Sequence, residues 1–298
     1  HLCDRRQRQM CIRDRDYIYV NEGNNTAALI EAFQKAKDTD HAVVVHINTL
    51  KGKGYAPAEQ HKEQWHYNAP FDLKTGMPLY PADGEDYSSV TRDYLLKKMK
   101  EDPTVVAITS GTPTVMGFTE DKRKEAGRQF VDVGIAEETA VALASGIAAN
   151  GGKPVYGVYS SFIQRTFDQI SQDLCIDKNP ATIVIFAGSV YGMNDVTHLG
   201  LQDIPMMSNI PNLVYLAPTT KEEYLAMLDW SIDQDQYPVA IKLPGGEMIS
   251  DSKKITKDFS QLNKYEVAEK GSKVAVIGLG TFYNMGCLLY TSPSPRDA

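Results

Sequence analysis

The stretch from residue 131 to residue 168 constrains the fold of this 298-residue chain more than any other. It opens with a short apolar segment, 131–136, that ends in small residues. A run rich in alanine, serine and glycine follows, with apolar side chains at 140, 144, 147 and 148, the spacing of one helix face. The apolar segment 155–159 comes next and predicts a strand. The stretch therefore predicts a strand, a helix with a thin surface, and a second strand.

Glu137 is the unusual residue of this stretch, because it lies where a strand meets a nearly all-apolar helix. Unpaired backbone N–H groups and the helix dipole favour a carboxylate at such a place, so Glu137 could be an ordinary first-turn charge. Alternatively, it is a partly buried carboxyl group that shares a proton with a ligand. The residues alone leave both interpretations open.

Further along the chain, helical and strand patterns alternate. Asn24 or Asn25 is a suitable N-cap for the first helix. Alternation of this kind predicts a parallel sheet covered on both faces, whose ligands bind beyond the carboxyl ends of the strands. Glu137 and Tyr159 fall at such ends. The expected helices are 24–37, 88–100, 162–175 and 221–233, and the further expected strands are 43–47, 105–108, 182–187, 238–242 and 273–277.

Composition excludes several classes of protein. The net charge of −7 gives no basis for a nucleic-acid surface. No apolar run approaches the length of a membrane span, and no apolar signal region lies near the start, so we expect a cytoplasmic protein. Of the four cysteines, Cys175 lies on an apolar helix face and is expected to be a small core residue, without a disulfide framework.

Two linked motifs resemble the pyrimidine-binding domain of the thiamine diphosphate-dependent transketolase family. They are Asp132-Val-Gly-Ile-Ala-Glu137 and Tyr159-Ser-Ser-Phe162-Ile-Gln-Arg165-Thr-Phe-Asp168-Gln169. The resemblance is strongest to the 1-deoxy-D-xylulose 5-phosphate synthase branch and covers roughly residues 16–286. It implies the thiamine diphosphate-binding fold, which is an α/β parallel sheet flanked by helices.

The two ends of the chain interrupt the family-like sequence abruptly and resemble translated sequencing read-through; a basic arm and a flexible tail are the competing interpretations. The proline- and glycine-rich segment in the first third suggests an extended connection between domains. The expected organisation is read-through at 1–15, the end of a diphosphate-binding first domain at 16–56, a linker at 57–86, a pyrimidine-binding transketolase-like domain at 87–250, the truncated start of a C-terminal transketolase domain at 258–286, and read-through at 287–298.

The resemblance also implies roles for individual residues. Glu137 would hydrogen-bond the aminopyrimidine ring and help to form its imino tautomer, with His66 and His198 as further catalytic residues. Ordinary loop, core and surface ion-pair roles remain the alternatives for the residues around it. A metal site at His61 and His66 is not expected, because the two are poorly spaced and no other ligands lie nearby. The implied cofactor-binding residues are Tyr55, Glu137, Tyr159, Phe162 and Arg165.

The chain departs from the family pattern at several positions. Ala187 and Gly245 stand where two arginines grip the phosphate of the acceptor, and neither side chain can pair with a phosphate. Either another cation, such as Lys242, replaces them or the acceptor differs. An acidic family residue falls at Asn194, or at Asp195 with a shift of one residue. Glu138-Thr139 replaces a Gln-His pair.

The Gly-Asp-Gly…Asn motif that binds the diphosphate through Mg²⁺ is absent from this sequence. We therefore expect a fragment that binds thiamine diphosphate weakly and is inactive by itself.

Gly278-Leu-Gly280 is not expected to be a dinucleotide fingerprint, because the third glycine and a complete βαβ unit are missing.

The resemblance implies a transferase that condenses pyruvate, with decarboxylation, and glyceraldehyde 3-phosphate in isoprenoid precursor synthesis. It further implies small-molecule substrates, Mg²⁺ as second cofactor and a homodimer, with no nucleic-acid or membrane partner. A transketolase that moves two-carbon ketol units between sugars is the first alternative, and a non-catalytic family member is the second.

Overall fold

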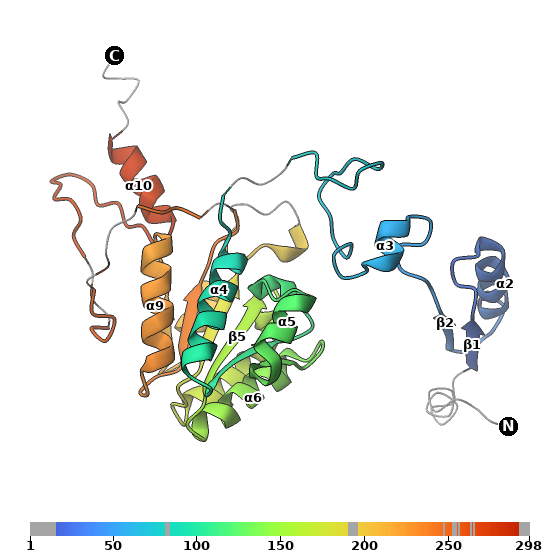
Figure 1. Ribbon diagram of the computed structural model, residues 1–298, viewed down its shortest axis with the longest axis horizontal. Coiled ribbons are helices and arrows are strands. Elements are labelled where there is room, and N and C mark those ends of the chain that lie inside the picture. Colours follow the sequence, from blue (N-terminus) through green and yellow to red (C-terminus); the bar gives the residue numbers. More distant parts are fainter. Residues whose placement is uncertain are drawn as a thin grey trace, which may run out of the picture. The chain divides into compact units, whose positions relative to one another are not determined.

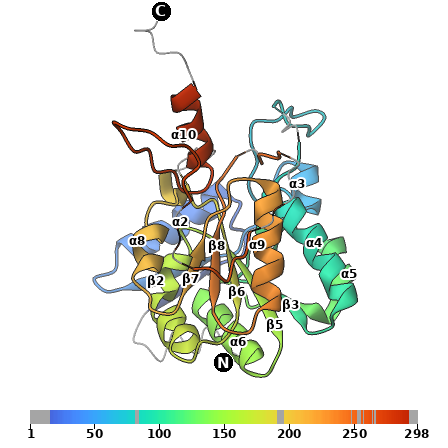
Figure 2. The same ribbon diagram turned by 90° about the vertical axis from the view of Figure 1, so that its left-hand side faces the viewer.

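The computed structural model describes residues 16–80, 84–189, 196–246, 248–251, 255, 257–262, 264 and 266–291. The chain divides after residue 83 into two compact units, and each is described by itself. Figure 1 labels their helices and strands, and Figure 2 shows them from a second side.

The first unit begins with a strand, a helix and a second strand that runs parallel to the first. These are β1 (Asp16–Val20), α2 (Thr26–Lys37) and β2 (Val43–Ile47). The side chain of Asn25 caps α2 by accepting hydrogen bonds from the backbone N–H groups of Ala27 and Ala28, at 3.0 and 3.4 Å. The predicted helix, cap and strand are confirmed here.

The segment after β2 is less extended than the sequence predicted. A short helix, α3 (Ala56–Gln60), begins with Pro57 in its first turn, a position that suits the fixed φ of proline. The prediction of extended chain is wrong for these residues. Beyond α3, the rings of Tyr55, Trp65 and Phe71 pack together, with Tyr55 and Phe71 at centroid distances of 5.0 and 4.8 Å from Trp65.

The second unit is built on a six-stranded sheet in which every neighbouring pair is parallel, in the order β4-β3-β5-β6-β8-β7. This confirms the predicted fold class. The short strand β7 lies at one edge of the sheet and was not predicted. The strands are β3 (Val105–Thr109), β4 (Phe130–Asp132), β5 (Lys153–Tyr159), β6 (Thr182–Phe186), β7 (Val214–Leu216) and β8 (Val239–Lys242).

Helices cover both faces of this sheet, as Figure 1 shows for α4 and α9 on one face and α6 on the other. In β5, Val155 packs into the core under α4 and α9, whereas Tyr156 and Val158 pack under α6. This alternation follows from the two-residue period of a strand. The helices are α4 (Tyr87–Glu101), α5 (Glu120–Ala126), α6 (Glu137–Ala149), α8 (Asp203–Ser208), α9 (Lys221–Asp233) and α10 (Phe282–Thr291).

The predicted continuous helix over 162–175 is wrong. The chain forms a 3₁₀ turn, η3 (Ile163–Thr166), one α turn, α7 (Phe167–Gln169), and a π-helical segment, η4 (Ile170–Cys175). The buried hydroxyl of Thr166 donates to the carbonyl of Ile163 at 2.7 Å, which occupies a carbonyl of the first turn and accompanies the tighter winding there.

The predicted strand at 273–277 is also wrong. Val274 and Ile277 are 79% and 87% exposed, and no partner strand pairs with this segment among the described residues. Apolar composition alone does not form a strand, because the backbone needs a neighbour for its hydrogen bonds. Helix α10 follows and runs across residue 287, so the non-native origin of 287–298 stays a prediction. None of the helices in the described ranges is long and apolar enough to cross a membrane.

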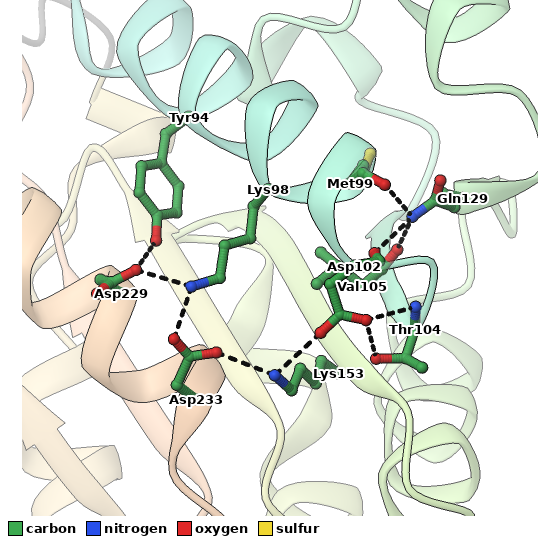
Figure 3. A network of polar contacts seen from close by, with 10 residues as sticks. All are labelled: Tyr94, Lys98, Met99, Asp102, Thr104, Val105, Gln129, Lys153, Asp229 and Asp233. Atoms are coloured by element: carbon green, nitrogen blue, oxygen red, sulfur yellow. Dashed lines mark hydrogen bonds and ion pairs between the residues drawn. The ribbon is translucent and has the colours of Figure 1, made fainter.

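A polar network joins α4, α9 and the beginning of β5 (Figure 3). Lys98 on α4 contacts Asp229 and Asp233 on α9, at 2.8 and 2.6 Å. Lys153, the first residue of β5, contacts Asp233 at 2.9 Å and Asp102 at 3.0 Å. The network therefore fastens two helices to the amino-end edge of the sheet, opposite the edge where ligands are expected.

Replacement of Asp102 should change the acid stability of the protein. Hydrogen bonds from Thr104, and then the Lys153 ammonium, lower the pKa of Asp102 to about 2. Its stabilising effect is therefore present above the ordinary carboxyl pKa of about 4 and is lost as the pH falls towards 2. In Asp102→Asn we expect a lower urea midpoint at pH 7 and a smaller loss of stability between pH 4 and pH 2. The exposed Asp177→Asn is the control, and an unchanged acid dependence in Asp102→Asn would contradict the assignment.

Candidate functional site

Glu137 opens α6 and is only 2% exposed. Its Oε2 lies 3.2 Å from Nη1 of Arg165, without forming a hydrogen bond to it. Oε2 is buried and has no hydrogen-bond partner among the residues that the structure describes. Glu137 is thus a buried carboxyl group, and not a solvated first-turn charge, with one oxygen left available to a ligand.

Asp132, the last residue of β4, shapes the loops around Glu137. Its Oδ1 accepts hydrogen bonds from the backbone N–H groups of Gly111 and Gly134, at 2.8 and 2.9 Å. Both glycines have positive φ, 77° and 74°, a backbone conformation that other residues rarely adopt. One carboxylate therefore joins the turn after β3 to the turn that leads into α6.

An aromatic group lies at the carboxyl end of β5. Tyr159 ends this strand, and its ring lies 5.6 Å from that of Phe162 in an edge-to-face arrangement. The ring of His198 lies 5.4 Å from Phe162 and 6.1 Å from Tyr159. The structure therefore brings together Tyr159 and Phe162, predicted from the motif at 159–169, and His198, predicted from a separate part of the chain.

The position of His198 depends on a close backbone approach two residues later. A Cβ atom on Gly200 would lie 2.5 Å from the carbonyl oxygen of Ala187 and 2.6 Å from both Cα of Gly188 and Oγ of Ser160. Real Cβ contacts are never this short, so only glycine lets the loop lie against the ends of β5 and β6.

Tyr156 of β5 and Ser110, which directly follows β3, are both buried, and their hydroxyl groups are 2.9 Å apart. Burial raises the pKa of Tyr156, and the negative charges of Glu137 and Glu138 add to the effect. Sequence reasoning missed Ser110, and it also missed Asp132 and Ser160. The Asp-x-Gly spacing was the available sign for Asp132, since aspartate often bonds backbone N–H groups two residues on.

Two predicted residues, Tyr55 and His66, belong to the first unit. His66 is exposed, and its Nδ1 accepts a hydrogen bond from the ammonium group of Lys51. Tyr55 packs against Trp65 and Phe71. Their assignment to a cofactor site stays a prediction. Asn194 and Asp195 lie outside the described residues.

The first unit also contains an open cavity of about 650 Å³ at the end of β2 and the start of α2. No predicted site residue lines it. In the described ranges, no group of three or more His, Cys, Asp or Glu side chains could hold a metal ion.

Comparison with known proteins decides the family. Residues 84–248, more than half of the chain, match the family described as "Transketolase, pyrimidine binding domain". The chain belongs to this family. The match covers Glu137, Tyr159, Phe162, Arg165 and His198, so these residues are those of the pyrimidine-binding domain.

The chain is similar to curated 1-deoxy-D-xylulose-5-phosphate synthases. It is 37% identical to that of Clostridium acetobutylicum over 266 residues, and 36% identical to a second one, from Geobacter metallireducens, over 267 residues. Each match covers 89% of this chain and 42% of the relative. The chain therefore spans less than half of the length of these relatives.

Solved structures agree on the fold. A Pichia stipitis transketolase crystallised with xylulose 5-phosphate superposes with a TM-score of 0.50 at 15% identity. The superposition covers 84% of this chain and 49% of the transketolase. At this identity the likeness concerns the fold alone.

The pairing of Glu137 with Arg165 can be tested by a double-mutant cycle. Arg165→Met should lower the free energy of unfolding by about 1–3 kcal/mol, because it leaves a buried carboxylate without its counter-charge. Adding Glu137→Gln to Arg165→Met should recover most of this loss. Urea unfolding followed by circular dichroism measures both effects, and Arg128→Met, at an exposed site, is the control. Additive effects of the two substitutions would show that the pair is not coupled.

Proposed function

We propose that the chain supplies the pyrimidine-binding side of a thiamine diphosphate-dependent transferase. The activity we assign to the complete enzyme is that of 1-deoxy-D-xylulose 5-phosphate synthase, the condensation of pyruvate, with decarboxylation, and glyceraldehyde 3-phosphate. The names of the relatives support this proposal, as does the family match. The single observation that carries it is the buried Oε2 of Glu137, which lacks a hydrogen bond within the described part of the chain.

These residues fit an aminopyrimidine ring. A buried carboxyl oxygen without a partner suits a ring nitrogen that donates or accepts a proton, because the bond would satisfy a polar atom that is otherwise left unpaired. The neighbouring rings of Tyr159 and Phe162 offer an apolar wall of the kind that flat heterocycles contact. Arg165, 54% exposed at its side chain, balances the charge of Glu137 when no ligand is present.

Thiamine diphosphate supplies, when bound, the electron sink that stabilises a carbanion. The residues of this chain hold protons and exclude water. Glu137 holds a proton at the pyrimidine nitrogen, and its burial keeps water from that exchange. His198 would act as a general acid or base for a carbonyl substrate, a role supported by its ring lying next to that of Phe162.

The acceptor needs separate consideration. Ala187 and Gly245 carry no charge, and the ammonium of Lys242 is paired with the buried carboxylate of Asp203. A phosphate at this place would compete with Asp203 for Lys242. We therefore propose pyruvate as donor and an aldehyde as acceptor, with glyceraldehyde 3-phosphate as the leading candidate on the strength of the relatives.

Mg²⁺ and a homodimer belong to the same proposal and concern the complete enzyme. A transketolase that transfers two-carbon ketol units is the alternative, and the absence of arginine at 187 and 245 weakens the synthase assignment against it. A non-catalytic family member is the second alternative. The group formed by Glu137, Tyr159, Phe162 and His198 counts against it, because a purely structural domain has no need for a buried carboxyl oxygen without a hydrogen bond.

The proposal predicts that Glu137→Gln in the complete enzyme lowers the rate of CO₂ release from pyruvate by about 10²–10⁴-fold, since the proton handler is lost. Glu138→Gln, at the adjacent and partly exposed position, is the matched control and should change the rate little. A ketose donor is assayed in parallel. Turnover of the ketose without CO₂ release from pyruvate would establish the transketolase alternative, and equal activity of both variants would exclude the role of Glu137.

A further inference from the structure

A buried ion pair joins the end of β8 to the start of α8, and the proposed function does not use it. The ammonium of Lys242, the last residue of β8, contacts Oδ2 of Asp203, the first residue of α8. The hydroxyl of Tyr215 donates to the same oxygen at 2.5 Å. Asp203 is fully buried, and the side chain of Lys242 is only 12% exposed. Both charges are therefore removed from water.

The lysine side chain runs along the end of β6. Lys242 is in register with Ile185 of β6, and the ladder continues beyond the strands, with the N–H of Gly188 donating to the carbonyl of Leu243 at 2.7 Å. A Cβ on Gly188 would lie 2.9 Å from Nζ of Lys242. The ammonium thus lies directly against the backbone at residue 188.

The loop that carries His198 contacts the same backbone. Gly200 approaches Gly188 so closely that a Cβ on Gly200 would lie 2.6 Å from Cα of Gly188. Asp203 follows three residues later in the chain and binds Lys242. Lys242 therefore contacts Asp203, the last residue of the segment 197–203. It also lies against Gly188, the backbone that Gly200 of the same segment approaches.

We propose that Lys242 is a positioning residue, which acts through Asp203 to hold the segment 197–203 against the end of β6 and so keeps the ring of His198 beside Phe162. That His198 acts in catalysis rests on the proposed function, whereas the positioning of its ring by Lys242 does not.

Two features distinguish this role from ordinary core stability. A buried ion pair gains little over an apolar pair of similar size, because desolvation of the two charges offsets their attraction. In addition, Oδ1 of Asp203 is buried and makes no hydrogen bond to any described residue. A pair selected for stability alone would not leave this oxygen unsatisfied. The ion pair between Lys242 and Asp203 instead fixes the direction of the segment that follows His198.

The experiment compares Lys242→Met with Lys257→Met in the chain as it is, with isotope-labelled histidine. Lys257 pairs at 2.9 Å with Glu223, another carboxylate whose side chain is only 5% exposed, and is the matched control. The signals of His198 are assigned with His198→Gln. We measure the nuclear Overhauser contacts between the His198 and Phe162 rings, and amide hydrogen exchange over 199–207.

Lys242→Met should abolish the His198–Phe162 contact and speed amide exchange over 199–207 at least tenfold, and Lys257→Met should change neither. Asp203→Asn is a second variant for the case that Lys242→Met fails to fold. Burial lowers the pKa of Lys242, and removal of the carboxylate takes away the group that opposes this shift. Asp203→Asn should weaken the same contact.

An intact contact and unchanged exchange in both variants, whatever their thermal stability, would overturn the positioning role. An equal response of Lys257→Met would do the same. These outcomes do not depend on thiamine diphosphate, so failure here is distinct from failure of the Glu137 assay.

Discussion

The burial of one carboxyl group at the start of α6 is the interaction on which the arrangement of this molecule depends. Parallel strands bring their carboxyl ends to one edge, and a helix that begins there offers unpaired N–H groups to an anion. Glu137 uses this position, and Arg165 comes from the segment after β5 to balance its charge. Asp132 fixes the turn that leads into α6 and joins it to the turn after β3. The sheet topology, the helix and the loops are thus all required to keep one carboxyl oxygen buried beside a counter-charge but without a hydrogen bond.

The two edges of the sheet differ in how fully their polar groups are paired. At the amino-end edge, Lys98 and Lys153 each contact two carboxylates, and Gln129 donates to three carbonyl groups (Figure 3). At the carboxyl-end edge, Glu137, Ser160 and Asp203 each keep a buried oxygen without a hydrogen bond to the described residues. Unsatisfied buried groups cost free energy, so they are tolerated where a ligand binds and the rest of the domain is stable enough to carry them.

Local pattern predicted several elements with their bounds. Helix α9 and strand β2 have the bounds expected from periodicity, and Asn25 caps α2 as its residue type suggests. The pattern failed where the outcome depends on distant residues. The segment 273–277 has the composition of a strand but no partner. The stretch after Phe162 has helical spacing, yet it winds as 3₁₀ and π turns around buried contacts that no window of sequence contains.

Within the site, too, local sequence predicted some residues, whereas others depend on contacts between distant segments. Family motifs identified the side chains that we propose to face a ligand, Glu137, Tyr159, Phe162 and His198, because their chemistry is visible in one short stretch each. They did not identify the residues that hold these side chains in place. Gly188, Gly200 and Lys242 come from three separate segments, and only their contacts show that they act together. A residue that positions another is recognised by the backbone approach it permits or the charge it neutralises, and both are properties of the assembled sheet edge, not of any motif.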